Sequence, residues 1–140
     1  MEIEFVNEVD IKYIYEIAKC YFDWTYDNFV SGLKSNNIFF KAVSEGEIVG
    51  FLIADDLIDS YNLLLIAVKE EFKNQNIATK LIKKLENIAK NKNIEKIWLE
   101  VKENNFPAIN LYKKNDFKNI YLRRNYYKSG ENALIFEKLI

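Results

Sequence analysis

Residues 96–117 read KIWLEVKENNFPAINLYKKNDF, and this stretch decides the fold. Aliphatic side chains occupy every second position in its first third, which is the period of a β-strand. Pro107 follows, and proline is tolerated in the first turn of a helix because its missing N–H has no intrahelical partner there. The stretch therefore predicts a strand, a helix over residues 106–115 and a further strand that starts near Phe117.

The flanking sequence repeats the same two periodicities. The resulting order β-α-α-β-β-β-α-β-α-β-β predicts an α/β fold, a mixed and mostly antiparallel sheet of about seven strands with about four helices on both faces. The other expected elements are a strand at Ile3–Phe5, a helix capped by Asp10 with Ile11, Ile14, Ile17 and Ala18 on one face, a helix that begins near Thr25, a hairpin of strands 38–43 and 48–54, a buried strand Leu63–Val68, a helix lined by Ile77, Leu81, Leu85 and Ile88, and strands near 117–126 and 132–139.

Length and composition exclude several classes of function. The chain has 140 residues, which predicts a single domain over 1–140. A net charge of −1 argues against nucleic-acid binding by bulk positive charge, and 49% hydrophobic residues exclude disorder. Histidine is absent, which removes His-based metal sites and Ser-His-Asp catalysis. Catalysis must then use carboxylates, Tyr, Lys, backbone groups or a bound cofactor, and we expect no metal.

The single cysteine and the N-terminus predict where the protein works. Cys20 has no partner for an internal disulfide, which fits a reducing compartment, and its apolar neighbours predict an inert core thiol. The acidic, alternating start of the chain is unlike a signal peptide. The longest aliphatic run, Leu63–Val68, is too short to span a membrane. We therefore expect a soluble cytoplasmic protein without membrane or direct nucleic-acid partners.

The junction after Leu63–Val68 has the outline of a phosphate site. A buried strand leads through residues 69–75 into a helix start, where free backbone N–H groups and the helix dipole favour an anion. Neither GxxxxGK[ST] nor a strand-linked GxGxxG occurs, so a nucleotide P-loop and a dinucleotide fingerprint are excluded.

Residues 98–105 (WLEVKENN) and 108–117 (AINLYKKNDF) resemble the LEVR-x-x-N and A-x-x-LY-x-x-x-GF segments of the GNAT superfamily of N-acetyltransferases. Asp116 replaces the usual Gly, and Asp also tolerates a left-handed helix end. Residues 123–127 (RRNYY) are similar to the RR-x-YY signature of members that acetylate protein N-termini, in particular the ribosomal-protein-alanine (RimI) type. The segment from Asp23 to Phe29 resembles that group's PWS…F segment.

The residues after the buried strand resemble the family's acetyl-CoA loop, [Q/R]-x-x-G-x-[G/A]. Lys73 falls at its first position and Ala78 at its last, and Asn76 replaces the usual Gly. Asn tolerates left-handed backbone angles, so we expect the loop to keep its shape. The resemblance implies a GNAT fold with acetyl-CoA as co-substrate, bound by Ile66, Ala67, Val68, Lys73, Asn74, Gln75, Asn76, Ile77, Ala78, Thr79, Asn105 and Tyr112.

Acetylation of an α-amine needs a group that takes its proton and a group that protonates the departing thiolate. Glu100 projects from the opposite side of its strand to Leu99 and Val101, so it can take that proton. Tyr112 follows at the family's spacing and is the expected proton donor to the CoA sulfur. The resemblance implies direct transfer to the N-terminal Ala of a small-subunit ribosomal protein. It also implies that Trp24, Arg124 and Tyr126 contact this substrate.

Structural interpretations of the same residues remain open at this point. Glu100 can be a solvent-facing residue paired with Lys96 or Lys102, Tyr112 a core residue, and Asn105 only a helix cap. Two further functions are also compatible with the fold. One is acetylation of a small amine or a lysine side chain, and the other is a degenerate CoA-binding domain without catalysis.

Overall fold

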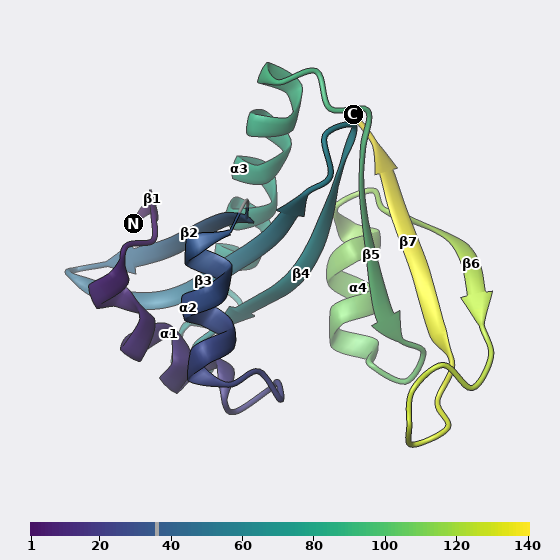
Figure 1. Ribbon diagram of the computed structural model, residues 1–140, viewed down its shortest axis with the longest axis horizontal. Coiled ribbons are helices and arrows are strands. Elements are labelled where there is room, and N and C mark those ends of the chain that lie inside the picture. The colour runs from purple at the N-terminus through teal and green to yellow at the C-terminus, as the bar shows by residue number, and fades with distance from the viewer. Residues whose placement is uncertain (36) are drawn as a thin grey trace.

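The computed structural model describes residues 1–35 and 37–140. Seven strands form one sheet in the order β1-β2-β3-β4-β5-β7-β6, and every neighbouring pair is antiparallel except β4 and β5 (Figure 1). The strands are β1 (Glu2–Phe5), β2 (Asn37–Ser44), β3 (Glu47–Asp56), β4 (Ser60–Val68), β5 (Lys96–Lys102), β6 (Lys118–Arg123) and β7 (Ala133–Leu139). The helices are α1 (Ile11–Ala18), α2 (Tyr26–Lys34), α3 (Ile77–Asn91) and α4 (Phe106–Lys114), with short 3-10 turns at Glu8–Asp10 and Glu70–Phe72. The predicted element order and mixed sheet are confirmed.

Two apolar cores lie on opposite faces of the sheet. Helices α1 and α2 pack over β3 and β4 around Phe29, Phe51 and Ile53. Helices α3 and α4 pack over the other face, where Leu85 and Leu99 lie in one cluster. Figure 1 shows α1 and α2 in front of the first half of the sheet and α3 behind it. The opposite face of β5, β7 and β6 carries Glu100, and neither core cluster extends over that residue.

Strands β4 and β5 separate soon after they begin. They pair only from Ser60 with Lys96 to Asn62 with Trp98. Beyond this point β4 contains an extra residue, Leu64, because Ala54 opposes Leu63 whereas Ile53 opposes Leu65. Such a bulge bends its strand and increases the local twist. The facing edges of β4 and β5 therefore lose their pairing, and the two strands diverge in Figure 1.

The bulge also changes the face of the sheet to which the following side chains of β4 point. Leu63 packs in the α3–α4 core, whereas Leu65 and Ala67 pack in the α1–α2 core. A regular strand would keep all three side chains on one face, since its side chains alternate with period two. The predicted strand is therefore buried on both faces, as expected, but with a register that the sequence pattern did not indicate.

Three local expectations are wrong. Asp10 does not cap α1 with its side chain; its carboxylate accepts from the Asn7 backbone N–H at 2.9 Å and pairs with Lys41 at 2.7 Å. Cys20 follows the end of α1 and is exposed, because the helix stops at Ala18 before another apolar turn can form. Strand β6 ends at Arg123, three residues before the predicted end.

Candidate active site

Two asparagines in the loop between β4 and α3 adopt the left-handed backbone conformation. Asn76 has φ 61° and ψ 21°, and Asn74 has φ 65°, so both residues are left-handed. This confirms the expectation that Asn76 keeps a conformation for which Gly is usual. Asp116, the second replacement of a customary Gly, is also left-handed at φ 68°, just after α4.

The first turn of α3 presents backbone N–H groups to solvent. Lys80 donates its N–H to the Asn76 carbonyl at 3.0 Å, and the three preceding helical N–H groups have no intrahelical acceptor by geometry. The Asn76 side chain does not cap them; its Oδ1 accepts from Lys114 Nζ at 3.1 Å instead. At α4, by contrast, Asn105 Oδ1 accepts from the Ala108 N–H at 3.3 Å. The start of α3 is thus suited to an anion, and Asn105 acts as a cap.

Lys73 is held beside this loop by two neighbours. Its Nζ lies 2.8 Å from a Glu70 carboxylate oxygen and 4.7 Å from the centre of the Tyr21 ring. The Tyr21 hydroxyl donates to Glu70 at 3.2 Å and to the Val68 carbonyl at 3.4 Å. Glu70 raises the pKa of Lys73, and Lys73 lowers the pKa of Glu70. Both groups therefore stay charged at neutral pH, with a cation close to the predicted phosphate position.

Glu100 lies on β5 and projects away from the α3–α4 core. Its neighbours Leu99 and Val101 are buried in that core, whereas about a quarter of the Glu100 side chain is exposed. One carboxylate oxygen lies 3.5 Å from a guanidinium nitrogen of Arg123. The alternative partners are wrong, because Lys96 pairs with Glu137 and the Lys102 ammonium lies over the Tyr127 ring.

Tyr112 lies on α4 and is buried in the core on the other side of the sheet. Its ring packs against Phe117 and Phe136, with centroid separations of 6.0 and 6.3 Å. Burial raises the pKa of Tyr112 well above the ordinary tyrosine value. The phenol is therefore protonated at neutral pH, and the same shift makes it a weaker acid than an exposed tyrosine.

The expected base and acid lie on opposite faces of the sheet. Glu100 lies on one face of β5, and Tyr112 packs in the core on its other face. Pairing between β4 and β5 ends at Trp98, so Glu100 lies in the part of β5 whose edge has no partner on the β4 side.

The predicted substrate residues do not all share one environment. Trp24 is partly buried against the α1–α2 core, 5.0 Å from Phe29 between ring centres. Arg124 and Tyr126 are exposed in the connection between β6 and β7, where Asn125 is left-handed. Tyr126 meets the edge of Tyr127 at 5.2 Å. Of these three residues, Tyr126 is linked to Glu100, because Arg123 contacts both of them.

Two residues near Glu100 were missed by the sequence reasoning. Arg123, rather than Arg124, contacts the carboxylate and also lies 5.3 Å from the Tyr126 ring centre. Burial raises the pKa of Tyr127, and the negative charge of Glu100 adds to this effect. The sequence showed RRNYY as a block, but only the pairing of β5, β7 and β6 shows which member reaches Glu100.

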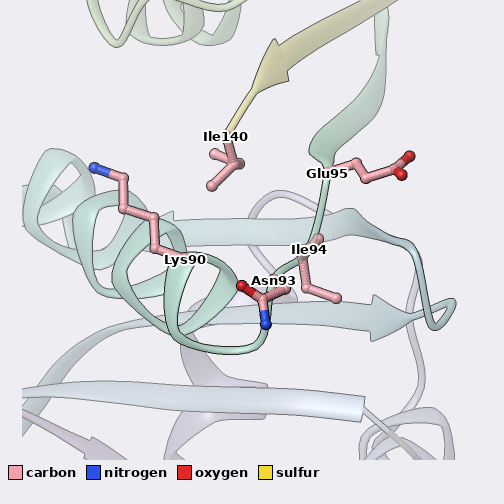
Figure 2. Close-up of a pocket in the computed structure, with 5 residues that line it drawn as sticks. All are labelled: Lys90, Asn93, Ile94, Glu95 and Ile140. Atoms are coloured by element: carbon pink, nitrogen blue, oxygen red, sulfur yellow. The ribbon is translucent and has the colours of Figure 1, made fainter.

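Two cavities are lined by residues other than the candidate site residues described above. One of about 310 Å³ opens beside the end of α3 and the C-terminus and is lined by Lys90, Asn93, Ile94, Glu95 and Ile140 (Figure 2). Another, of about 470 Å³, lies beside the buried Asp10–Lys41 pair.

In the residues that the structure describes, no group of three or more acidic or cysteine side chains could hold a metal ion. Within those residues no helix has the length and apolarity needed to cross a bilayer.

The fold is that of an α/β acetyltransferase, and the chain belongs to the acetyltransferase (GNAT) family, whose model matches residues 4–117. It is an N-acetyltransferase.

Several known proteins are similar over most of the chain. An N-alpha-acetyltransferase of Saccharolobus solfataricus is 31% identical over 130 residues, covering 83% of this chain and 78% of its own. A ribosomal protein bS18-alanine N-acetyltransferase of Haemophilus ducreyi is 31% identical over 139 residues, covering 95% and 96%. The crystal structure of the corresponding Escherichia coli enzyme superposes with a TM-score of 0.91 at 28% identity, covering 99% of this chain and 93% of that one.

Proposed function

We propose that this chain acetylates the N-terminal α-amine of a protein and that its acceptor is the N-terminal Ala of a small-subunit ribosomal protein. The observation that carries the proposal is the position of Glu100 in the part of β5 that β4 no longer pairs, outside the core in which Tyr112 packs. Relatives of similar length that are named for N-α-acetylation or bS18-alanine acetylation support the choice of acceptor. The free Cys20 thiol supports a cytoplasmic setting.

We propose that acetyl-CoA lies along the parted strands. The unpaired edge of β4, from Ile66 to Val68, offers backbone N–H and C=O groups to the amides of the pantetheine arm. The uncapped N–H groups at the start of α3 suit the pyrophosphate, with Lys73 as a nearby cation. Of the cofactor residues proposed from the sequence, Ile66–Val68 and Lys73–Thr79 belong to the end of β4, the following loop and the start of α3, whereas Asn105 and Tyr112 belong to the cap and the body of α4.

The proposed reaction is a direct transfer with both substrates bound. The neutral amine attacks the acetyl carbonyl, a C–N bond forms and the C–S bond of the thioester breaks. Glu100 accepts the amine proton, directly or through a water, and Tyr112 donates its proton to the departing sulfur. Holding both reactants together supplies much of the rate, so no covalent enzyme intermediate is needed.

The first test is calorimetric titration with acetyl-CoA, followed by acetylation assays on a panel of acceptors. We expect micromolar binding and transfer to an Ala-initiated peptide. The same peptide with a blocked N-terminus but an internal lysine, and a small polyamine, should react poorly. Preferential transfer to either of these would contradict N-terminal specificity, and no transfer to any acceptor would contradict the proposal altogether.

Glu100→Gln tests the proposed base. We expect the turnover number to fall about 100-fold, the lower end for loss of a general base, while the acetyl-CoA dissociation constant stays within about twofold. Glu137→Gln is a matched control, because Glu137 has similar exposure, lies on the same face of the sheet and pairs with Lys96 at 3.6 Å. Equal activity in Glu100→Gln and Glu137→Gln would remove Glu100 from the mechanism.

A further inference from the structure

Arg123 reaches Glu100 across an intervening strand. Arg123 opposes Ala133 on β7, and Glu100 opposes Ile135, so the two charged residues lie on the same face of β6 and β5 with β7 between them. Two strand spacings amount to about 10 Å, which only a pair of long side chains can bridge. Ala133 is the residue over which the guanidinium must pass, and its methyl group leaves the path open.

The same guanidinium also contacts the connection between β6 and β7. Its central carbon lies 5.3 Å from the centre of the Tyr126 ring, which is half exposed. The contact with Glu100 is a single one, at 3.5 Å, from an arginine side chain that is 44% exposed. An exposed contact of this kind contributes little to stability, so stability alone does not account for it.

We propose that Arg123 is a positioning residue of this site. Its guanidinium holds the Glu100 carboxylate beside the path of the acceptor, and its positive charge favours the neutral form of the acceptor amine. The inference rests on the proposed function. The physical reason is that the attacking amine must lose a proton, and a like charge nearby lowers the pKa of an ammonium group. Arg123 would thus increase the fraction of reactive amine at neutral pH.

Several other charged groups on this face have partners, and Lys118, which also lies on it, is at the opposite end of β6 from Arg123. Lys96 pairs with Glu137, the Lys102 ammonium lies over the Tyr127 ring, and Glu103 accepts from the Asn132 amide. Glu131, in the β6–β7 connection, accepts from Ser129. Tyr121 lies in the same row as Glu100, because both residues oppose Ile135 of β7. Burial raises the pKa of Tyr127, the charge of Glu100 raises it further, and Tyr127 therefore carries no charge near pH 7.

The test is the pH profile of kcat for an Ala-initiated peptide in Arg123→Gln, Arg123→Lys and Lys96→Gln, because kcat reports ionisation in the complex with bound acceptor. Lys96→Gln is the matched control, since it breaks a cation–carboxylate contact of 3.6 Å on the same face with a nearly equal exposed fraction, 43%. In Arg123→Gln we expect the acidic limb to move to higher pH by about half a unit and kcat at pH 7 to fall about tenfold.

Arg123→Lys separates charge from geometry. It keeps the positive charge but loses the planar fork, so we expect the acidic limb to stay near its wild-type position while kcat recovers only in part. Circular dichroism and acetyl-CoA affinity, both expected to be unchanged, show whether each variant is folded. A profile for Arg123→Gln equal to that of Lys96→Gln overturns the inference. A wild-type protein that acetylates no N-terminal peptide instead overturns the proposed function, and the inference with it.

Discussion

Tyr112 shows how one residue can serve both the core and the proposed chemistry. Its ring packs with Phe117 and Phe136, and burial raises its pKa, so the proton remains on the phenol at any pH where the enzyme would work. A buried tyrosine is an ordinary core residue. From its place in the sequence, Tyr112 could be either a core residue or a proton donor. Loss of the hydroxyl, with retention of the ring, separates them.

We expect Tyr112→Phe to lower the rate of acetyl transfer about 100-fold, because the departing thiolate loses its proton donor. Acetyl-CoA affinity and the melting temperature at pH 7 should stay near wild-type values, since the ring packing is preserved. Steady-state kinetics and calorimetry measure these quantities. Full activity in this variant would leave Tyr112 with a packing role alone.

The same variant is the reference for a predicted pH dependence of the free energy of unfolding of the wild type. The pKa of Tyr112 is raised in the folded protein, whereas in the unfolded chain tyrosine ionises near pH 10. Its contribution is fully present below pH 10 and is lost as the pH rises above 10, because only the unfolded state releases the proton there. We expect the free energy of unfolding of the wild type to fall relative to Tyr112→Phe by up to about 1.4 kcal/mol per pH unit. Urea unfolding between pH 8 and pH 11 measures the difference, and parallel curves would contradict it.

At the scale of elements, α3 begins and ends next to left-handed asparagines. Asn76 precedes the helix with φ 61°, and Asn93 follows it with φ 57°. The backbone requirement is the same at both ends, but only the first end lies at the junction with β4. The two positions therefore form a matched pair for separating loop shape from helix stability.

We expect Asn76→Ala and Asn93→Ala each to destabilise the protein by about 1 kcal/mol, because Ala lacks the short polar side chain that lets Asn tolerate a left-handed backbone. Only Asn76→Ala should also weaken acetyl-CoA binding, whereas Asn76→Gly should retain it. Denaturant unfolding and calorimetry measure the two effects. Unchanged acetyl-CoA affinity in Asn76→Ala would argue against the phosphate position proposed at this loop.

At the scale of the whole molecule, the sheet consists of two halves held together by a short junction. Strands β4 and β5 share three residue pairs before they diverge, and α3 packs across both halves. Glu86 on α3 is almost fully buried and pairs with Lys138 on β7 at 3.0 Å, while its second carboxylate oxygen is buried without a partner in the described residues. This ion pair connects the helix that begins at the loop with the half of the sheet that carries Glu100.

We expect Lys138→Met to destabilise the protein by about 3 kcal/mol, because the buried Glu86 then retains only its weaker contact with Lys83 at 3.4 Å. Replacing both partners, in Glu86→Leu/Lys138→Met, should restore most of this loss, since no charge is left buried. A double-mutant cycle by urea unfolding measures the coupling. A double variant less stable than Lys138→Met would contradict the expectation.

The element order, the helix start near Thr25, the cap at Asn105, and the tolerance of Asn76 and Asp116 for left-handed backbone were predictable, because each depends on residues that are neighbours in the sequence. The errors arose where distant segments decide the outcome. Asp10 turns toward Lys41 of β2 instead of capping its helix. The Glu100 partner lies on β6, two strands away, so no sequence period could indicate it.

The sequence alone determined the class of fold and the chemistry available, because strand and helix periods are local and because a chain without histidine is left with carboxylates, Tyr, Lys, backbone groups or a bound cofactor. Only the tertiary structure decided how these groups meet. The extra residue at Leu64 parts β4 from β5, and the pairing of β5 with β7 and β6 brings Arg123 to Glu100. The physical reason is that strand register and bulges follow from side-chain packing between segments far apart in the chain, which local patterns do not specify.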